Sequence, residues 1–415
     1  MDVDQPTSSA AANPLAFLEQ QEAAAPPSLQ PAWTEIRTAY EKKLWHNLTV
    51  ALLKFVALPG SGSAQIELFD KFITSIEDKI NALRLVEIAR RVGREYAEPE
   101  LTLKFLENVH SRLGSPYPVE ATDDAPAQPA PARPVPEAFV LSLSALAYAQ
   151  LLLGDLSGCK KRLDECDKLL NEQDTVEPLV YAGYYGVAAD YYKVKADYGP
   201  YYKSALLYLA CVDEKELSDE DRRARAHDLC IAALLGDTIY NFGELLQHPI
   251  LQTLDGDYTW IKELISAFNA GAIGKFDSLS NHFGAEPILE ESRAFLRQKI
   301  CLMALIQAAF ERPRDGKTRL MTFEQIGEAT RLPVHEVEHL IMKALSLGLI
   351  RGSLDQVAST VDLAWVQPRV LEGSQLDTLG EQFGHWTDAV GQTANGVAGL
   401  EAGVGLNGVT HALAA

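Results

Sequence analysis

The stretch that decides the fold is MTFEQIGEATRLPVHEVEHLIMKALSLGLIRGSLDQVASTVDLAWVQP, residues 321–368. Thr322 and Gln325 have the spacing of a capping box, in which each side chain bonds the backbone of the other residue, and this predicts the start of a short helix. Pro333 opens a second helix, which ends at Gly348, because proline suits the first turn of a helix and glycine its end.

Two segments rich in β-branched and aromatic residues follow, at 349–351 and 363–366, and both are predicted strands. The residues between them, 352–362, are predicted as a loop. The order helix, helix, strand, loop, strand is that of a winged helix, which we place at about 318–368.

Winged helices often bind DNA, so the charge of this one discriminates between functions. Residues 320–368 contain three basic and six acidic side chains, and the whole chain has 37 Lys and Arg against 57 Asp and Glu, a net charge of -20. Phosphates would be repelled, so no nucleic-acid partner is expected. Contact with another protein suits this winged helix better than DNA binding does, with the edge of its sheet pairing with a neighbour's sheet. The predicted contact residues there are Leu349, Ile350, Arg351, Trp365 and Val366.

Upstream of the winged helix, the sequence predicts an all-α solenoid. Apolar residues at steps of three and four predict one long helix over 33–58. Hairpins of paired helices recur at about 40 residues, as in tetratricopeptide-like or HEAT-like repeats. The predicted helices are 64–80, 81–94, 99–113, 138–153, 157–171, 179–195, 200–212, 218–236, 258–269, 272–282 and one of about 24 residues from Pro287.

Composition marks two segments that are not expected to fold as helices. Residues 1–30 are rich in Ala, Pro, Ser and Gln and are predicted to form a flexible arm. Residues 114–136 are dominated by Pro and Ala and are predicted to be a surface insert or linker. The N-terminal repeats would then occupy 31–198.

Downstream of the winged helix, a C-terminal helix is predicted over 370–392, followed by a flexible tail over 393–415. Steps of 3, 4, 3 and 4 are typical of a coiled-coil seam, so this helix is expected to pack against partner helices. Several glycines interrupt it, and we expect it to become ordered on assembly. The predicted contact residues are Leu376, Leu379, Phe383, Trp386 and Val390.

No cofactor, catalytic residue or metal ligand is predicted. The five cysteines are scattered without CxxC spacing, which favours a reducing compartment, and there is no signal peptide or apolar run long enough to cross a membrane. One motif points the other way: His335, Glu336 and His339 fit HExxH, the zinc-binding pattern of metalloproteases, but no third ligand follows at a known spacing.

The sequences LPVHEVE at 332–338 and GLIRG at 348–352, in a winged helix that directly follows a solenoid, resemble the PCI domain family. The resemblance implies a PCI domain over 199–369. Within that family, the stretch from MTFEQI at 321–326 to WVQPRVL at 365–371 is most similar to a subunit of the lid of the proteasome regulatory particle.

This resemblance implies a non-catalytic scaffold in the lid, which takes part in ubiquitin-dependent protein degradation in the cytoplasm and nucleus. Its partners would be other PCI-type lid subunits, through winged-helix edges, and the lid helical bundle, in a hetero-oligomer. Two other interpretations stay open. One is a PCI scaffold subunit of the COP9 signalosome or of the translation initiation factor three complex, and the other is a zinc hydrolase.

Overall fold

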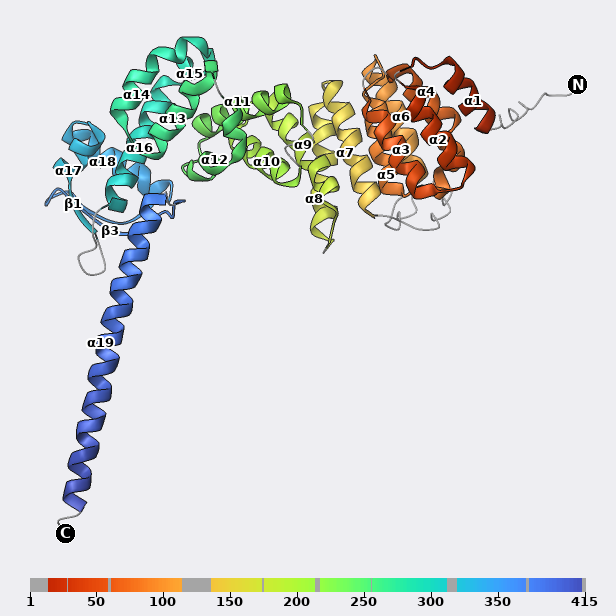
Figure 1. Cartoon of the computed structure of the whole chain (residues 1–415). Coiled ribbons are helices and arrows are strands. Elements are labelled where there is room, and N and C mark those ends of the chain that lie inside the picture. Colours follow the sequence, from red (N-terminus) through yellow and green to blue (C-terminus); the bar gives the residue numbers. More distant parts are fainter. Residues whose placement is uncertain are drawn as a thin grey trace, which may run out of the picture. The chain divides into compact units, whose positions relative to one another are not determined.

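The computed structural model describes residues 14–27, 29–58, 61–113, 136–173, 175–212, 217–254, 256–311, 319–370 and 373–412. These residues are helical apart from one three-stranded sheet and the connecting turns (Figure 1). The chain divides into two compact units, Met1–Ser218 and Asp219–Ala415. The predicted insert lies outside the described residues, except for Pro136, which begins a helix.

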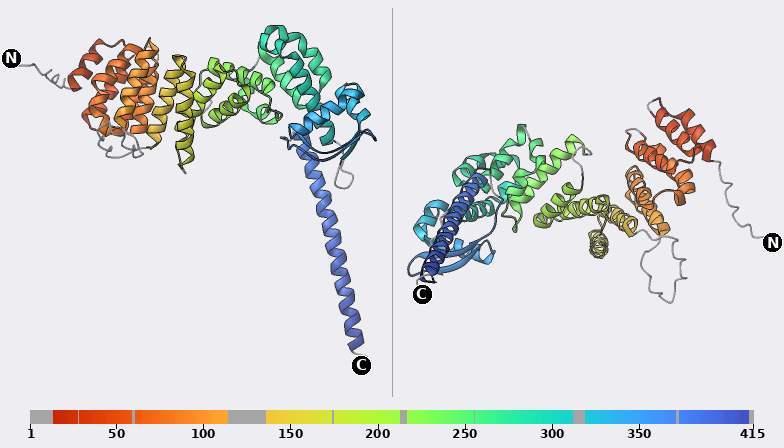
Figure 2. Two further views of the ribbon diagram at one scale, coloured as in Figure 1. Left: turned by 180° about the vertical axis from the view of Figure 1, so that it is seen from behind. Right: turned by 60° about the horizontal axis from the view of Figure 1, so that its bottom comes forward.

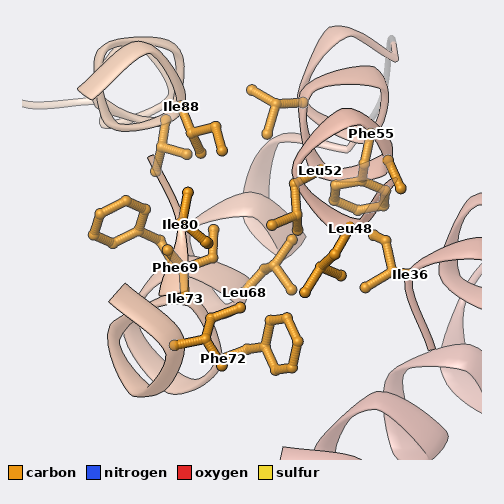
Figure 3. Packing of buried hydrophobic residues seen from close by; sticks show 14 of the residues in the cluster. Ile36, Leu48, Leu52, Phe55, Leu68, Phe69, Phe72, Ile73, Ile80 and Ile88 are labelled. Atoms are coloured by element: carbon orange, nitrogen blue, oxygen red, sulfur yellow. The ribbon is translucent and has the colours of Figure 1, made fainter. Parts of the chain in front are cut away.

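The first unit begins with helices packed around one apolar core. They are α1 (Pro14–Ala24), α2 (Gln30–Glu41), α3 (Trp45–Ala57), α4 (Gly62–Lys71), the 3-10 helix η1 (Ile73–Lys79), α5 (Ala82–Gly93) and α6 (Pro99–Leu113). Figure 3 shows side chains of this core, among them Leu52, Phe55 and Phe72, which are fully buried. Because aliphatic and aromatic side chains from α2, α3, α4 and η1 meet here, burial of apolar area holds these helices together.

Three predictions for this region are wrong. The single helix predicted over 64–80 is α4 followed by the 3-10 helix η1. The arm predicted over 1–30 contains α1, because Phe17 and Leu18 are buried in the core and offset the entropy cost of ordering the segment. The single helix predicted over 33–58 is two helices. Lys43 adopts a left-handed conformation (φ 54°), which ends α2 and reverses the chain so that α3 packs against α2.

The second part of this unit has the predicted hairpins. They are α7 (Pro136–Leu152) with α8 (Leu156–Asn171), and α9 (Pro178–Val194) with α10 (Tyr198–Cys211), seen from two further directions in Figure 2. α7 also packs against α9, and a Cβ atom at Gly183 would stand 2.6 Å from Leu141 Cδ1, so glycine permits this close approach. The predicted boundary at 198 falls inside the α9–α10 hairpin. The division between the two compact units lies after Ser218 in the sequence.

The second unit is also helical before its sheet. Its helices before the sheet are α11 (Asp219–Leu235), α12 (Gly243–Gln247), η3 (Pro249–Thr253), η4 (Gly256–Tyr258), α13 (Thr259–Asn269), α14 (Ile273–Leu279), η5 (Ser280–Ala285), α15 (Pro287–Glu291) and α16 (Arg293–Glu311). The long helix predicted from Pro287 is broken at Ser292 (φ -90°, ψ 10°). The break allows both Leu289 before it and Leu296 after it to be fully buried.

A buried lysine joins two of these helices. Lys299 on α16 is 1% exposed, and its Nζ donates hydrogen bonds to the carbonyl oxygens of Ala233 (2.8 Å), Leu234 (3.0 Å) and Gly236 (2.7 Å) at the end of α11. The last carbonyls of a helix lack partners within the helix, and a cation suits the negative end of the helix dipole. Lys299 therefore satisfies the C-terminus of α11 and fixes it to α16.

The winged helix follows, as predicted. It consists of β1 (Arg319–Thr322), α17 (Phe323–Thr330), α18 (Val334–Ser346), β2 (Ile350–Asp355) and β3 (Thr360–Val366). The capping box at the start of α17 is confirmed, with both reciprocal hydrogen bonds present. Gly348 ends the α18 segment with φ 70°, a conformation that glycine adopts without strain.

The sheet differs from the prediction in two ways. Its order is β1-β3-β2, and β1 was not predicted because it has only four residues and runs directly into the capping box. The loop predicted over 352–362 is wrong, because most of it forms an antiparallel hairpin in which Leu354 pairs with Val361, leaving a short turn at 356–359.

The C-terminal helix, α19 (Gly373–Ala412), is 40 residues long and is drawn in blue in Figure 1. The predicted end at 392 is wrong, as is a flexible tail over 393–412. Glycines lower helix stability by about 1 kcal/mol each but keep the backbone donor, and the segment has no proline to break it. None of the described helices, α19 included, has an apolar stretch long enough to cross a membrane.

Candidate protein-interaction surfaces

The first candidate surface is the outer edge of the winged-helix sheet. β3 is the central strand, because β2 pairs along its length and β1 pairs with residues 360–363 on its other side. The outer edge of β2 has no strand partner among the described residues. An edge strand presents backbone donors and acceptors that a neighbouring chain can use.

The predicted edge residues differ in how buried they are and in which strand they occupy. Leu349 and Ile350 are 2% and 1% exposed, so their side chains belong to the core. The Leu349 backbone is bonded within the fold, because its amide donates to the carbonyl oxygen of Ala344 and its own carbonyl oxygen accepts from the Gln367 amide. Trp365 and Val366 are half-buried on the central strand rather than on an edge strand. Arg351 is exposed on β2, and it is the predicted edge side chain that a partner could contact directly.

Arg351 and Trp365 form a pair on this sheet. The guanidinium carbon of Arg351 lies 4.8 Å from the centroid of the Trp365 ring, in a cation–π contact. The strands shift register directly after Arg351, and a Cβ atom at Gly352 would overlap the carbonyl oxygen of Asp362. The bulge therefore needs glycine, and it ends the part of the β2–β3 pairing that carries the Arg351–Trp365 pair.

The second candidate surface is the apolar seam of α19. The exposed fractions of its five predicted residues are 53% for Leu376, 36% for Leu379, 58% for Phe383, 73% for Trp386 and 62% for Val390. The structure therefore brings the five together on one helix and leaves them uncovered by the described residues. Large apolar side chains exposed in a row mark an interaction surface rather than a solvated helix face.

The positions that flank this seam are small or uncharged. They are Gly380, Thr387 and Ala394 on one side, and Gln382, Ala389 and Gly396 on the other. Two-stranded coiled coils usually carry opposite charges at these flanks, which set the choice of partner. Without such charges, and with small residues that allow close approach, α19 is better suited to a bundle with helices on both flanks than to a single partner helix.

The HExxH motif lies on α18, where His335 and His339 are both exposed. The His335 side chain is 79% exposed, and its Nε2 is 3.8 Å from Glu336 Oε1. The part of the chain that the structure describes contains no group of three His, Cys, Asp or Glu side chains that could hold a metal ion.

The cysteines are predominantly buried thiols. Burial raises the pKa of Cys159 to about 11 and those of Cys166 and Cys230 to about 12. The thiolate is the reactive form, so these side chains act as small apolar residues in the core rather than as nucleophiles.

Sequence reasoning missed the residues that fix the chain where it leaves the sheet. Arg369 and Val370 follow β3 and contact residues far earlier in the sequence, among them Asn269 and Gly243. Contacts between residues this far apart in the chain leave no local pattern. A single sequence therefore contains no signal that pairs Arg369 with Asn269 or Val370 with Gly243.

A winged helix that directly follows helical repeats defines the PCI class, and the family model described as PCI domain matches residues 275–364. The model described as PSD13 N-terminal repeats matches residues 32–265, more than half of the chain. The chain belongs to the family of 26S proteasome non-ATPase regulatory subunit 13, which confirms the resemblance noted in the sequence.

Individual relatives agree with this assignment. The chain is 38% identical over 386 residues to 26S proteasome non-ATPase regulatory subunit 13 homolog B of Arabidopsis thaliana, covering 91% of this chain and 96% of that protein. It is 36% identical to 26S proteasome regulatory subunit RPN9 of Saccharomyces cerevisiae, covering 88% and 92%. The chain is 26% identical to eukaryotic translation initiation factor 3 subunit M of Coccidioides immitis over 190 residues, which cover 45% of this chain and 39% of that protein.

Proposed function

We propose that this protein is a non-catalytic scaffold subunit of the lid of the 26S proteasome regulatory particle. In this role it supports lid assembly, and through it ubiquitin-dependent protein degradation, in the cytoplasm and nucleus. Family membership supports the proposal, since relatives similar over about nine-tenths of this chain are named as proteasome regulatory subunits.

The observation that carries the proposal is the exposed seam of α19. Burying one large apolar side chain contributes about 1.5 to 3 kcal/mol, so the five seam residues together can hold the chain in a complex. Phe383 and Trp386 lie at the middle of the seam, where aromatic side chains usually dominate binding energy. The lid helical bundle is the partner proposed for this surface.

The outer edge of β2 is the second proposed contact, with a winged helix of another PCI-type subunit. Backbone hydrogen bonds along an added strand would supply affinity, while the Arg351–Trp365 pair beside the edge would select the partner. With six acidic and three basic residues in 320–368, this winged helix is suited to protein rather than to nucleic acid. In this proposal the protein is one subunit of a hetero-oligomer, to which it contributes two different surfaces.

Deleting residues 371–415 tests the proposal. The shortened chain should lose only the helical signal of α19 itself and keep the melting temperature of the full chain, because the seam of α19 is not covered by the described residues. When it is expressed with an affinity tag, it should recover much less of the lid than the full chain recovers. Equal recovery of lid subunits by the two chains would contradict the proposal.

Mass spectrometry of the proteins recovered by the full chain separates this function from the related interpretations. Recovery of signalosome or initiation-factor subunits in place of proteasome subunits would favour another PCI scaffold. Stoichiometric zinc in the purified protein, lost in His335→Ala, would revive the hydrolase interpretation.

A further inference from the structure

The segment that joins the winged helix to α19 is held against the helical array at two points. The Gln367 amide donates to the carbonyl oxygen of Leu349 (2.9 Å), which is the last backbone bond at the end of the sheet. Arg369 then reaches back to residues 62 and 100 positions earlier in the chain. Such long-range contacts are unusual for a simple linker, which normally runs freely over the surface.

The first point is the Arg369 guanidinium. One terminal nitrogen donates to Oε1 of Gln307 on α16, and the other donates to both the backbone oxygen and Oδ1 of Asn269 (3.1 Å to Oδ1). Asn269 is 6% exposed and is the last residue of α13, so a cation there also meets the negative end of a helix. Arginine suits this place because its planar fork can serve two acceptor groups at once.

The receiving surface is rigid. Gly271 follows α13 with φ 64°, and a Cβ atom there would stand 2.7 Å from the Cα atom of Ala304 on α16. The end of α13 is therefore packed directly onto the backbone of α16. Arg369 binds across this crossing, on a part of the fold that has little freedom to move.

The second point is Val370. A Cβ atom at Gly243, the first residue of α12, would stand 2.6 Å from Val370 Cβ. Gly243 does not have a positive φ, so the reason for glycine here is space rather than backbone conformation. Any side chain at this position would displace Val370 from the place it occupies against Gly243.

We propose that Arg369, Val370 and Gly243 form an anchor that fixes the origin of α19 relative to the winged helix, and that Arg369 is its positioning residue. The consequence for assembly rests on the function proposed above. Gly373, the first residue of α19, is three residues after Val370, so it can lie no more than roughly 11 Å from the anchor. The start of α19 is thereby kept within this distance of the anchor.

The size of the effect follows from tether length. With the anchor released, the last fixed point is Gln367, and the tether to Gly373 doubles from three residues to six. Effective concentration falls roughly as the -3/2 power of tether length, so binding through both surfaces should weaken roughly threefold.

Limited digestion with trypsin tests the anchor directly in the full chain, without any partner. It cleaves after arginine, but only when the side chain can leave its contacts and enter the specificity pocket of the protease. Gly243→Ala displaces Val370 and leaves Arg369 itself unchanged. Cleavage after residue 369 should then be roughly tenfold faster, as expected for loss of about 1.4 kcal/mol of holding energy.

Two further variants complete the design. Gly284→Ala is the matched control, because a Cβ atom there meets nothing within 4 Å, and it should be cleaved as slowly as the natural sequence. Arg369→Lys keeps a tryptic site and the charge but lacks the planar fork, and it should also be cleaved faster. Equal cleavage rates for the natural sequence, Gly243→Ala and Arg369→Lys would overturn the anchor. If Gly243→Ala does not fold by circular dichroism, Arg369→Lys decides alone.

The same variants, incorporated into the lid, separate this inference from the proposed function. Roughly threefold faster exchange of Gly243→Ala out of the complex, with Gly284→Ala unchanged, is the expected result. If deletion of 371–415 abolishes incorporation while Gly243→Ala exchanges like the control, the function stands and the anchor is wrong. If the deletion has no effect, the role of α19 in the proposed function is wrong, and the trypsin assay still judges the anchor.

Discussion

At the scale of single residues, Lys299 links two helices of the second unit, α11 and α16. Its ammonium group contacts three carbonyl oxygens and lies 5.4, 5.3 and 5.9 Å from the ring centroids of Tyr240, Phe242 and Phe295. Burial lowers its pKa to about 7, while the carbonyls and the ring faces favour the charged form. Without this side chain, the end of α11 would present buried carbonyls that lack a donor.

Lys299→Met should therefore lower the free energy of unfolding by about 2 kcal/mol or more, because an unsatisfied buried polar group costs about 1 to 3 kcal/mol. Lys275→Met, at an exposed position on α14, is the control and should change stability by less than about 0.5 kcal/mol. Chemical denaturation of the full chain measures both. Coincident unfolding curves for the two variants would show that Lys299 is not a link.

His227 provides a link that depends on pH. The carboxylates of Asp228 and Glu286 raise its pKa; of the two, Glu286 is the hydrogen-bonded partner, 2.9 Å from Nε2, whereas Asp228 lies 3.8 Å from Nδ1. Its ring also packs edge-on against Tyr258, at 4.9 Å. The contact joins α11 to Glu286, the N-cap residue of α15.

Because the pKa of His227 is raised in the folded state, its protonation stabilises the fold below the ordinary histidine pKa, and this contribution is lost as pH rises through the raised value. His227→Gln should thus cost most stability near pH 6 and least near pH 9. Denaturation at several pH values measures this, with His335→Gln, at an exposed site, as the control. A pH-independent difference between His227→Gln and the natural sequence would contradict the ion pair.

At the scale of elements, the sequence predicted what is local and repetitive. The capping box of α17, the helices of the hairpins and the order of the winged helix are all encoded in short spacings that a backbone must obey. The seam of α19 was predicted by the same periodicity. These features need no knowledge of the rest of the chain.

What could not be predicted depends on contacts distant in sequence. Nothing local marks the left-handed Lys43 that splits α2 from α3, since lysine rarely adopts that conformation without tertiary support. β1 is a strand only because β3 lies beside it. The burial of Leu349 and Ile350 follows from packing beneath the sheet, so these two side chains are not exposed at the edge, and the edge contact itself stays a prediction.

The capping box gives an element-scale prediction. Thr322 Oγ1 accepts from the Gln325 amide at 3.3 Å, and the Thr322 amide donates to Gln325 Oε1 at 3.2 Å. Thr322→Ala should lower stability by about 1 kcal/mol, because one donor at the start of α17 loses its acceptor. Ser346→Ala, at the exposed end of α18, should have less than half of that effect, and thermal melting of the two variants compares them. Equal melting temperatures would argue against the cap.

At the scale of the whole molecule, the chain offers two dissimilar surfaces, a backbone edge on the winged helix and an apolar seam on α19. In the proposed function, each of these two surfaces joins a different partner. The apolar cores of the first unit, and the buried side chains of the second such as Phe268, Phe276 and Leu296, do not include the seam residues. The surfaces can therefore be altered without loss of the fold, and this makes the proposed function testable by substitution.

The most direct test places charge on the seam and, in a matched variant, beside it. Phe383→Asp with Trp386→Asp puts two carboxylates in the seam, whereas His385→Asp with Gln392→Asp puts two on the opposite, exposed face of the same helix. The amount of tagged full chain that incorporates into the proteasome lid is measured for each. We predict at least a tenfold loss for the seam variant, as burying a charge without a partner is costly, and normal incorporation for the matched variant. Equal incorporation of both variants would contradict the account.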